Sequence, residues 1–134
     1  MLLHYNIYSL IFINLINFKY IRIENETKPR DLIKFIYSEK GWNLPKPKLI
    51  ISVTGGTKQF KMPNNMKIAF KRGLIKAAVS TDAWIITCGI NDALTRSVGD
   101  ALAEELDKSE LNIPILGIAS WGVINMKEKL INQV

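Results

Sequence analysis

The chain has 134 residues, of which 48% are hydrophobic, and its 18 basic and 12 acidic side chains give a formal net charge of +6. This length and hydrophobic content fit one domain or part of one. The basic residues are scattered and no nucleic-acid-binding motif accompanies them, which disfavours nucleic-acid binding. With one cysteine, Cys88, and one histidine, His4, the chain lacks the residues for an internal disulfide or a zinc cluster, so a cytosolic location is favoured.

Residues 1–18 differ from the rest of the chain. The run 2–18 is apolar, but His4, Asn6, Asn14 and Asn17 interrupt it. A membrane span needs about 20 mostly apolar residues, and a signal peptide needs an early positive charge and a small-residue cleavage site. Neither pattern is met. We therefore expect residues 1–18 to be an apolar, non-native extension outside the domain, which would span residues 19–134.

From residue 19 onward, short apolar runs alternate with longer amphipathic segments. The runs predict strands at residues 20–23, 49–53, 83–87 and 113–119. Pro29 suits the first turn of a helix that ends by Gly41. The run 127–130 predicts a last short helical stretch.

Two longer helices are predicted in the second half of the chain. Asn64 or Asn65 caps the first, whose apolar stripe comprises Met66, Ala69, Phe70, Gly73, Leu74, Ala77 and Ala78. Asn91 or Asp92 caps the second, whose apolar positions are Leu94, Val98, Ala101, Leu102 and Leu106. Strands alternating with such helices predict an α/β, Rossmann-like three-layer fold, with a mostly parallel sheet and helices on both faces.

In such folds, ligands bind beyond the carboxyl ends of the strands. Two loops have that position. In residues 52–58, paired glycines allow close approach of an anion, with hydroxyl donors and a lysine counter-charge nearby. In residues 87–96, Gly89 permits a tight turn and Arg96 can pair with a phosphate. Neither loop is a P-loop or a GxGxxG motif, so an ordinary tight turn remains the alternative.

Several ordered blocks strengthen the functional interpretation. Leu44-Pro45 and the segments 48–56, 72–78, 83–87, 98–102 and 117–124 follow one another along the chain. In this order they resemble the N-terminal cytosolic homology region of melastatin-type (TRPM) cation channels. The resemblance covers about Lys19 to Ile131. In that family the region belongs to the SLOG superfamily, is similar to nucleotide-processing LOG enzymes, and in some members binds ADP-ribose or a related nucleotide that controls gating.

The resemblance implies a ligand-sensing or assembly region of a TRPM-like, calcium-permeable cation channel, present without the pore and on the cytoplasmic side of the membrane. Its partners would be other channel segments and the subunits of a homotetramer. A small nucleotide such as ADP-ribose would be the regulatory ligand. The implied ligand-binding residues are Thr54, Gly55, Gly56, Thr57, Lys58, Gly89, Asn91, Arg96, Ser120 and Trp121.

Some positions depart from the family pattern. The family's Gly-Gly-Thr-Asn appears here as residues 88–91, Cys-Gly-Ile-Asn, and Ala93 stands where a further glycine is usual. The added side chains would weaken a phosphate cradle. This favours, as the first alternative, an interaction module that binds no ligand. Stopping at Val134 would also leave the sheet short of the family's further strands and expose an apolar edge.

Enzyme activity is not expected. LOG enzymes carry a Pro-Gly-Gly-x-Gly-Thr-x-x-Glu motif that this sequence lacks. Glu104 and Glu105 lie late on their helix, and Cys88 without a nearby histidine is expected to be a packing residue. We therefore assign no catalytic or metal-binding residue. A standalone nucleotide-binding SLOG-type protein remains the second alternative.

Overall fold

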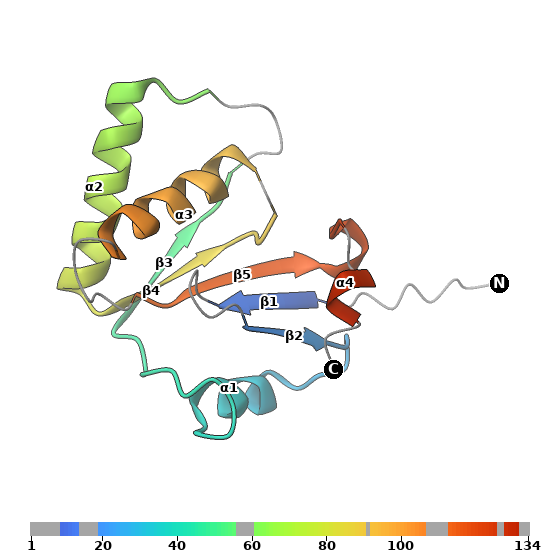
Figure 1. Cartoon of the computed structure of the whole chain (residues 1–134). Coiled ribbons are helices and arrows are strands. Elements are labelled where there is room, and N and C mark those ends of the chain that lie inside the picture. Colours follow the sequence, from blue (N-terminus) through green and yellow to red (C-terminus); the bar gives the residue numbers. More distant parts are fainter. Residues whose placement is uncertain are drawn as a thin grey trace.

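The computed structural model describes residues 9–13, 19–55, 61–90, 92–106, 113–125 and 128–131. Figure 1 shows the elements in chain order. They are β1 (Ser9–Ile13), β2 (Lys19–Ile23), α1 (Pro29–Tyr37), β3 (Leu49–Val53), α2 (Asn64–Ser80), β4 (Ala83–Thr87), α3 (Ala93–Leu106), β5 (Ile115–Ser120), the short 3-10 helix η1 (Trp121–Val123) and α4 (Glu128–Ile131).

The strands form one five-stranded sheet in the order β2-β1-β5-β4-β3. Strands β3, β4 and β5 are parallel, as expected for strands linked by crossover helices. Strand β1 pairs antiparallel with β2 and with β5. The predicted Rossmann-like α/β class is confirmed by this parallel half of the sheet and by the helices that cover it (Figure 1).

Strand β1 was not predicted. Ser9 pairs with Ile23 of β2 and with Ser120 of β5, so residues 9–13 lie inside the sheet. The expectation that the whole of residues 1–18 stays apart from the fold is therefore wrong for this segment. The sequence Ser-Leu-Ile-Phe-Ile suits a strand because branched and aromatic side chains fit a pleated surface, and the polar interruptions lie on either side of it. The domain boundary at residue 19 stays a prediction.

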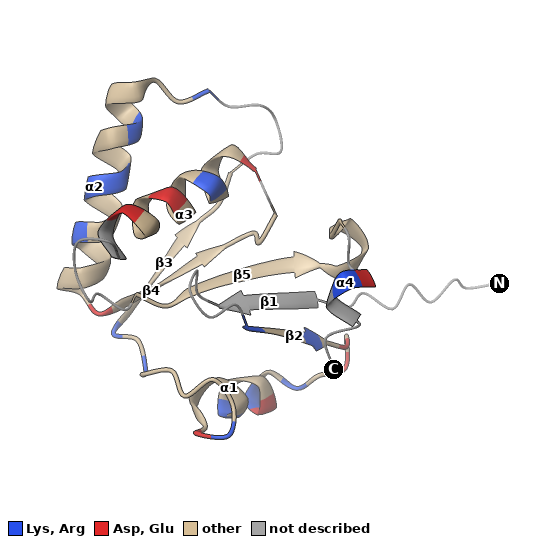
Figure 2. Cartoon of the chain, in the orientation of Figure 1, with Lys and Arg blue, Asp and Glu red and all other residues tan. Residues whose placement is uncertain are grey.

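Helices α2 and α3 lie side by side over the parallel strands. The ribbon in Figure 2 is coloured for basic residues along α2, and for both acidic and basic residues along α3. Lys71 pairs with Glu104 at 2.6 Å, and Lys67 pairs with Asp100 at 3.6 Å. Each of these pairs is partly exposed, so its contribution to stability is small. The two helices are held together mainly by packing of their apolar side chains.

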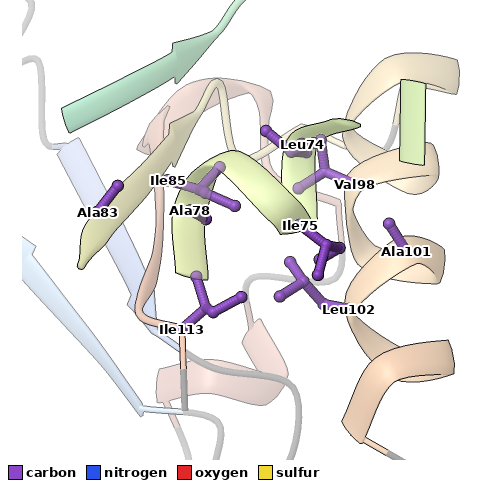
Figure 3. Close-up of a cluster of buried hydrophobic side chains, with 9 residues drawn as sticks. All are labelled: Leu74, Ile75, Ala78, Ala83, Ile85, Val98, Ala101, Leu102 and Ile113. Carbon is purple, nitrogen blue, oxygen red and sulfur yellow. The ribbon is translucent and has the colours of Figure 1, made fainter. Parts of the chain in front are cut away.

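Two clusters of buried side chains fill the two sides of the sheet. The cluster beneath α2 and α3 comprises Leu74, Ile75, Ala78, Ala83, Ile85, Val98, Ala101, Leu102 and Ile113 (Figure 3). The cluster beneath α1 comprises Ile36, Trp42, Trp84 and Leu116. Because successive side chains of a strand point to opposite faces, Ile85 of β4 lies in the first cluster and Trp84 in the second. The expected helices on both faces are thus present, and Trp84 is a core residue.

The observed ends of α1 and α2 differ slightly from those predicted. Helix α1 stops at Tyr37, because the Ser38 hydroxyl donates to the Phe35 carbonyl oxygen at 3.1 Å and Ser38 itself is extended. Helix α2 begins at Asn64 with Pro63 in the capping position. The Asn65 side chain accepts from the neighbouring Met66 N–H at 2.9 Å.

The predicted apolar stripe of α2 is only partly buried. Leu74 and Ala78 pack into the core, and Ile75 joins them. The other small members of the stripe, Ala69, Gly73 and Ala77, are exposed, as is Met66. The buried face of α2 is the one turned towards α3 and β4. The prediction that the whole apolar stripe packs on one face is therefore wrong for Met66, Ala69, Gly73 and Ala77. Of the exposed small residues, Ala69 and Gly73 line a hollow between α2 and β3.

Candidate functional site

The three parallel strands end at one edge of the sheet. Val53 at the end of β3 lies opposite Thr87 at the end of β4, and Thr87 lies opposite Gly117 of β5. The loops that follow β3 and β4 and the first turn of α3 therefore meet beyond this edge. This is where open parallel sheets bind ligands, because helix N-termini present free N–H groups there.

Gly89 holds the loop after β4 against β5. Its φ of +64° lies in the left-handed region, which side chains disfavour. A Cβ atom at this position would lie 2.9 Å from the Gly117 carbonyl carbon and 3.0 Å from the Ile118 nitrogen. The predicted tight turn at Gly89 is therefore present, and it requires glycine both for the backbone angle and for the close approach to β5.

The loop after β3 packs against the start of α3. A Cβ atom on Gly55 would lie 2.8 Å from Leu94 Cδ2 in the first turn of that helix. Thr54, also predicted as a site residue, lies with Leu94 along a hollow between β3 and α2. The structure thus brings Thr54 and Gly55 to the N-terminus of α3, as a shared ligand site would require.

Asp92 occupies the N-terminus of α3 itself. Its Oδ1 accepts the Thr95 backbone N–H at 2.6 Å, and its Oδ2 accepts the Cys88 thiol at 3.1 Å. The Cys88 sulfur also lies 3.3 Å from the Thr95 hydroxyl oxygen. A carboxylate is favourable at this end of a helix, and here it uses an N–H group that a phosphate would otherwise bind. Cys88 is a partly buried member of this cap.

The same hydrogen bonds determine the pKa of Asp92. Partial burial would by itself raise the pKa of the carboxyl group. Hydrogen bonds from the Thr95 backbone N–H, the Cys88 thiol, the Thr95 hydroxyl and the Leu94 backbone outweigh burial and lower the pKa below its ordinary value of 3.8. Asp92 is therefore a stable negative charge at neutral pH.

We expect Asp92→Ala to lower the free energy of unfolding by about 1 kcal/mol at pH 7, because a helix cap is lost. Since the folded pKa of Asp92 lies below the unfolded one, its contribution is present above the unfolded value of 3.8 and is lost as the pH falls through the folded value. Urea denaturation should show a smaller difference in the free energy of unfolding between the wild-type chain and Asp92→Ala at pH 3 than at pH 7. A difference in the free energy of unfolding that does not change with pH would contradict this account. The control is Asp92→Asn, which keeps a capping oxygen and should lower the free energy of unfolding by only a few tenths of a kcal/mol.

Arg96 stands one turn into α3 and is exposed. It lines a small hollow of about 170 Å³ together with Met62, Lys67, Ala93 and Ser97. Lys67 comes from α2 and was not predicted as a site residue. Lys67 is also paired with Asp100 at 3.6 Å, and the two cations beside this hollow give it a positive charge that suits an anionic group. The sequence alone gave no signal for Lys67, because only the packing of α2 on α3 brings it there.

Ser120 and Trp121 lie on the β5 side of the edge. They follow Gly117, the residue opposite Thr87, so the end of β5 projects beyond the end of β4. Ser120 is exposed and Trp121 is half-buried. The Arg22 guanidinium carbon lies 5.1 Å from the centroid of the Trp121 ring, a cation–π contact from β2. Trp121 is thus anchored from the far strands rather than from α3.

The predicted site residues Gly56, Thr57, Lys58 and Asn91 lie outside the described residues, and their roles stay predictions. Within the described ranges, no group of His, Cys, Asp and Glu side chains is arranged to hold a metal ion. In the same part of the chain, no helix has the length and apolar character needed to cross a membrane.

Comparison with known proteins gives consistent matches. A family model described as SLOG in TRPM matches residues 18–134. Transient receptor potential cation channel subfamily M member 7 of Rattus norvegicus is 42% identical over 115 residues, which cover 86% of this chain and 6% of the relative. Member 1 of the same subfamily from Mus musculus is 44% identical over 114 residues, covering 85% and 7%. The subfamily M member-like 2 protein of Nematostella vectensis is 40% identical over 116 residues, again covering 85% and 7%. The chain therefore matches a small fraction of the length of each relative.

Proposed function

The chain belongs to the family of SLOG domains found in TRPM proteins, and from this premise we propose that it is the cytosolic N-terminal sensing and assembly region of a TRPM-like, calcium-permeable cation channel. The support is the match over residues 18–134 together with relatives whose names are those of cation channels. In this role the region lies on the cytoplasmic side of the membrane without the pore. Its partners are the other segments and subunits of a homotetrameric channel.

We propose a small nucleotide of the ADP-ribose class as the regulatory ligand. The observation that carries this assignment is the common edge formed by the ends of β3 and β4, with Gly55 packed against Leu94 and Gly89 against β5. Arg96 and Lys67 supply positive charge beside the first turn of α3. Trp121, on the β5 side, supplies an aromatic surface for a base. A nucleotide would extend along this edge, with its phosphates towards Arg96.

Isothermal titration of the chain with ADP-ribose tests the sensing role. We expect heat of binding at up to millimolar ligand, and Arg96→Ala should weaken binding on the order of tenfold, because a charge-assisted hydrogen bond to phosphate is lost. Arg30→Ala is the matched control. Arg30 is an exposed arginine at the start of α1, on the opposite face of the sheet from α3, and its loss should leave binding unchanged. No heat from the wild-type chain, or equal losses in the two variants, would contradict ligand sensing at this edge.

An interaction module without a ligand is the second candidate function. Asp92 places a carboxylate where a phosphate would bind, and Ile90 in the same loop is 41% exposed. A negative charge repels a nucleotide phosphate, whereas an exposed apolar side chain suits contact with another protein segment. Co-purification of the chain with neighbouring channel segments, together with an absence of heat in the titration, is the result that this candidate predicts.

A further inference from the structure

Helix α2 carries positive charge only. Among its 17 residues are four basic side chains and no acidic one. The basic residues form two rows, each with a spacing of four residues: Lys67 with Lys71, and Arg72 with Lys76. Side chains four residues apart are neighbours on a helix, and like charges at this spacing repel each other. Any compensating negative charge must therefore come from another element.

Helix α3 compensates the first row. The Lys67 ammonium nitrogen lies 3.6 Å from a carboxylate oxygen of Asp100, and that of Lys71 lies 2.6 Å from a carboxylate oxygen of Glu104. Asp100 and Glu104 are themselves four residues apart, so two carboxylates on one helix match two ammonium groups on the other. The contact between α2 and α3 thus shows which chemistry fits a basic row of α2.

The second row has no such compensation in the part of the chain that the structure describes. Arg72 and Lys76 are both exposed, and the side chain of neither is in an ion pair or hydrogen bond with a described residue. Ile68, which is 53% exposed, and Val79, which is 39% exposed, flank them. These four residues follow one another at intervals of three or four, so they form one continuous stripe along the helix, here called the outer stripe of α2.

The outer stripe borders a groove of about 440 Å³ between α2 and α3. Ile68 and Arg72 line this groove, with Asn64 on the same helix and Ala101 on α3. Both of its walls are described helices, so its shape is set by α2 and α3 alone. Grooves between packed helices bind amphipathic helices through apolar side chains at intervals of three or four residues. The outer stripe has this spacing.

We propose that the outer stripe of α2 binds an acidic amphipathic helix of a protein partner. Two carboxylates four residues apart on that helix pair with Arg72 and Lys76, and apolar side chains on its same face cover Ile68 and Val79. A membrane surface fits less well, because helices that lie in the membrane interface present a wide apolar face, whereas the outer stripe has two separated aliphatic side chains. The inference needs no nucleotide and does not depend on the channel role proposed above.

Fluorescence anisotropy of a labelled peptide mixed with the whole chain tests the proposal. The probe is an alanine-based helical peptide of about 18 residues, with two glutamates four residues apart and leucines on the same face. We expect binding at low salt with up to about millimolar chain, and Arg72→Glu or Lys76→Glu should weaken it on the order of tenfold, because an attractive charge pair becomes repulsive. Arg30→Glu and Lys34→Glu are the matched controls. Both residues are exposed on α1, on the opposite face of the sheet, and their reversal should leave binding unchanged.

Charge reversal of the probe separates loss of pairing from loss of folding. A peptide with lysines in place of the glutamates should bind the wild-type chain weakly and the double variant Arg72→Glu, Lys76→Glu more tightly, which an unfolded variant would not do.

Four results would overturn the proposal. The first is no binding of the glutamate peptide to the wild-type chain, and the second is an equal loss of binding in Arg30→Glu and Arg72→Glu. The third is equal binding of a peptide of the same composition whose glutamates lie two residues apart, because such glutamates do not share a helix face. The fourth is sedimentation of the chain with phosphatidylserine vesicles, abolished by Arg72→Glu, without peptide binding. That result would assign the outer stripe to a membrane surface.

Discussion

Replacing Ile85 by alanine is expected to lower the free energy of unfolding by about 4 kcal/mol, because the side chain is completely buried and its loss leaves a cavity. Ile85 lies in the central strand of the parallel trio, among side chains from α2, α3 and β4 (Figure 3). The neighbours belong to three different elements, so they cannot all move inwards to fill the space. A typical domain has a free energy of unfolding of about 5–15 kcal/mol, so a loss of about 4 kcal/mol is a large fraction of it.

Urea denaturation followed by circular dichroism measures this change. Both variants are measured at one low protein concentration, so that self-association does not enter the comparison. Ile33→Ala is the control: Ile33 on α1 is 44% exposed, and its truncation should lower the free energy of unfolding by less than about 1 kcal/mol. A loss of similar size in the two variants would show that the cluster around Ile85 is not the stabilising core.

The parallel half of the fold was predictable because its signals are local. The apolar runs at 49–53 and 83–87 are short, rich in branched side chains and closed by glycine-containing turns, and they form β3 and β4 within those bounds. The spacing between them requires a crossover helix, and a crossover helix implies parallel pairing. The α/β class follows from such steps without knowledge of any contact between distant residues.

The site was predictable in part for the same reason. Gly55 and Gly89 follow strands directly, so their place at the carboxyl edge follows from the class of fold. Two contributions were not predictable. Lys67 joins the hollow at Arg96 only through the packing of α2 on α3. The Cys88 thiol donates to Asp92, and no local sequence rule specifies that contact.

The rest of the fold depends on partners that a sequence pattern does not specify. Residues 9–13 satisfy the pattern of a strand, but their place between β2 and β5 depends on two neighbours distant in sequence. In α2, periodicity marks an apolar stripe without saying which half faces the core. The structure buries Leu74 and Ala78 and leaves Gly73 exposed, which is why the surface beside β3 could not be derived from the pattern alone.

Two glycines of this chain should respond to alanine in opposite directions. Gly89→Ala is expected to lower the free energy of unfolding by about 3 kcal/mol, because a Cβ is strained at φ +64° and would press on the Gly117 and Ile118 backbone. Gly73→Ala is expected to raise it by up to about 1 kcal/mol, since alanine restricts the unfolded chain and is favourable inside a helix.

The two variants serve as controls for each other, because each adds one methyl group and changes no charge. Urea denaturation of both at the same low concentration gives the comparison. If Gly89→Ala were neutral, the loop after β4 would have room to leave β5, and the close approach at Gly117 would not be what fixes the candidate site. If Gly89→Ala is destabilised while Gly73→Ala is not, Gly89 is required by its backbone angle and its close approach to β5, without any ligand. Glycine at that position would then be needed with or without a bound nucleotide, and its presence could not by itself identify a phosphate-binding loop.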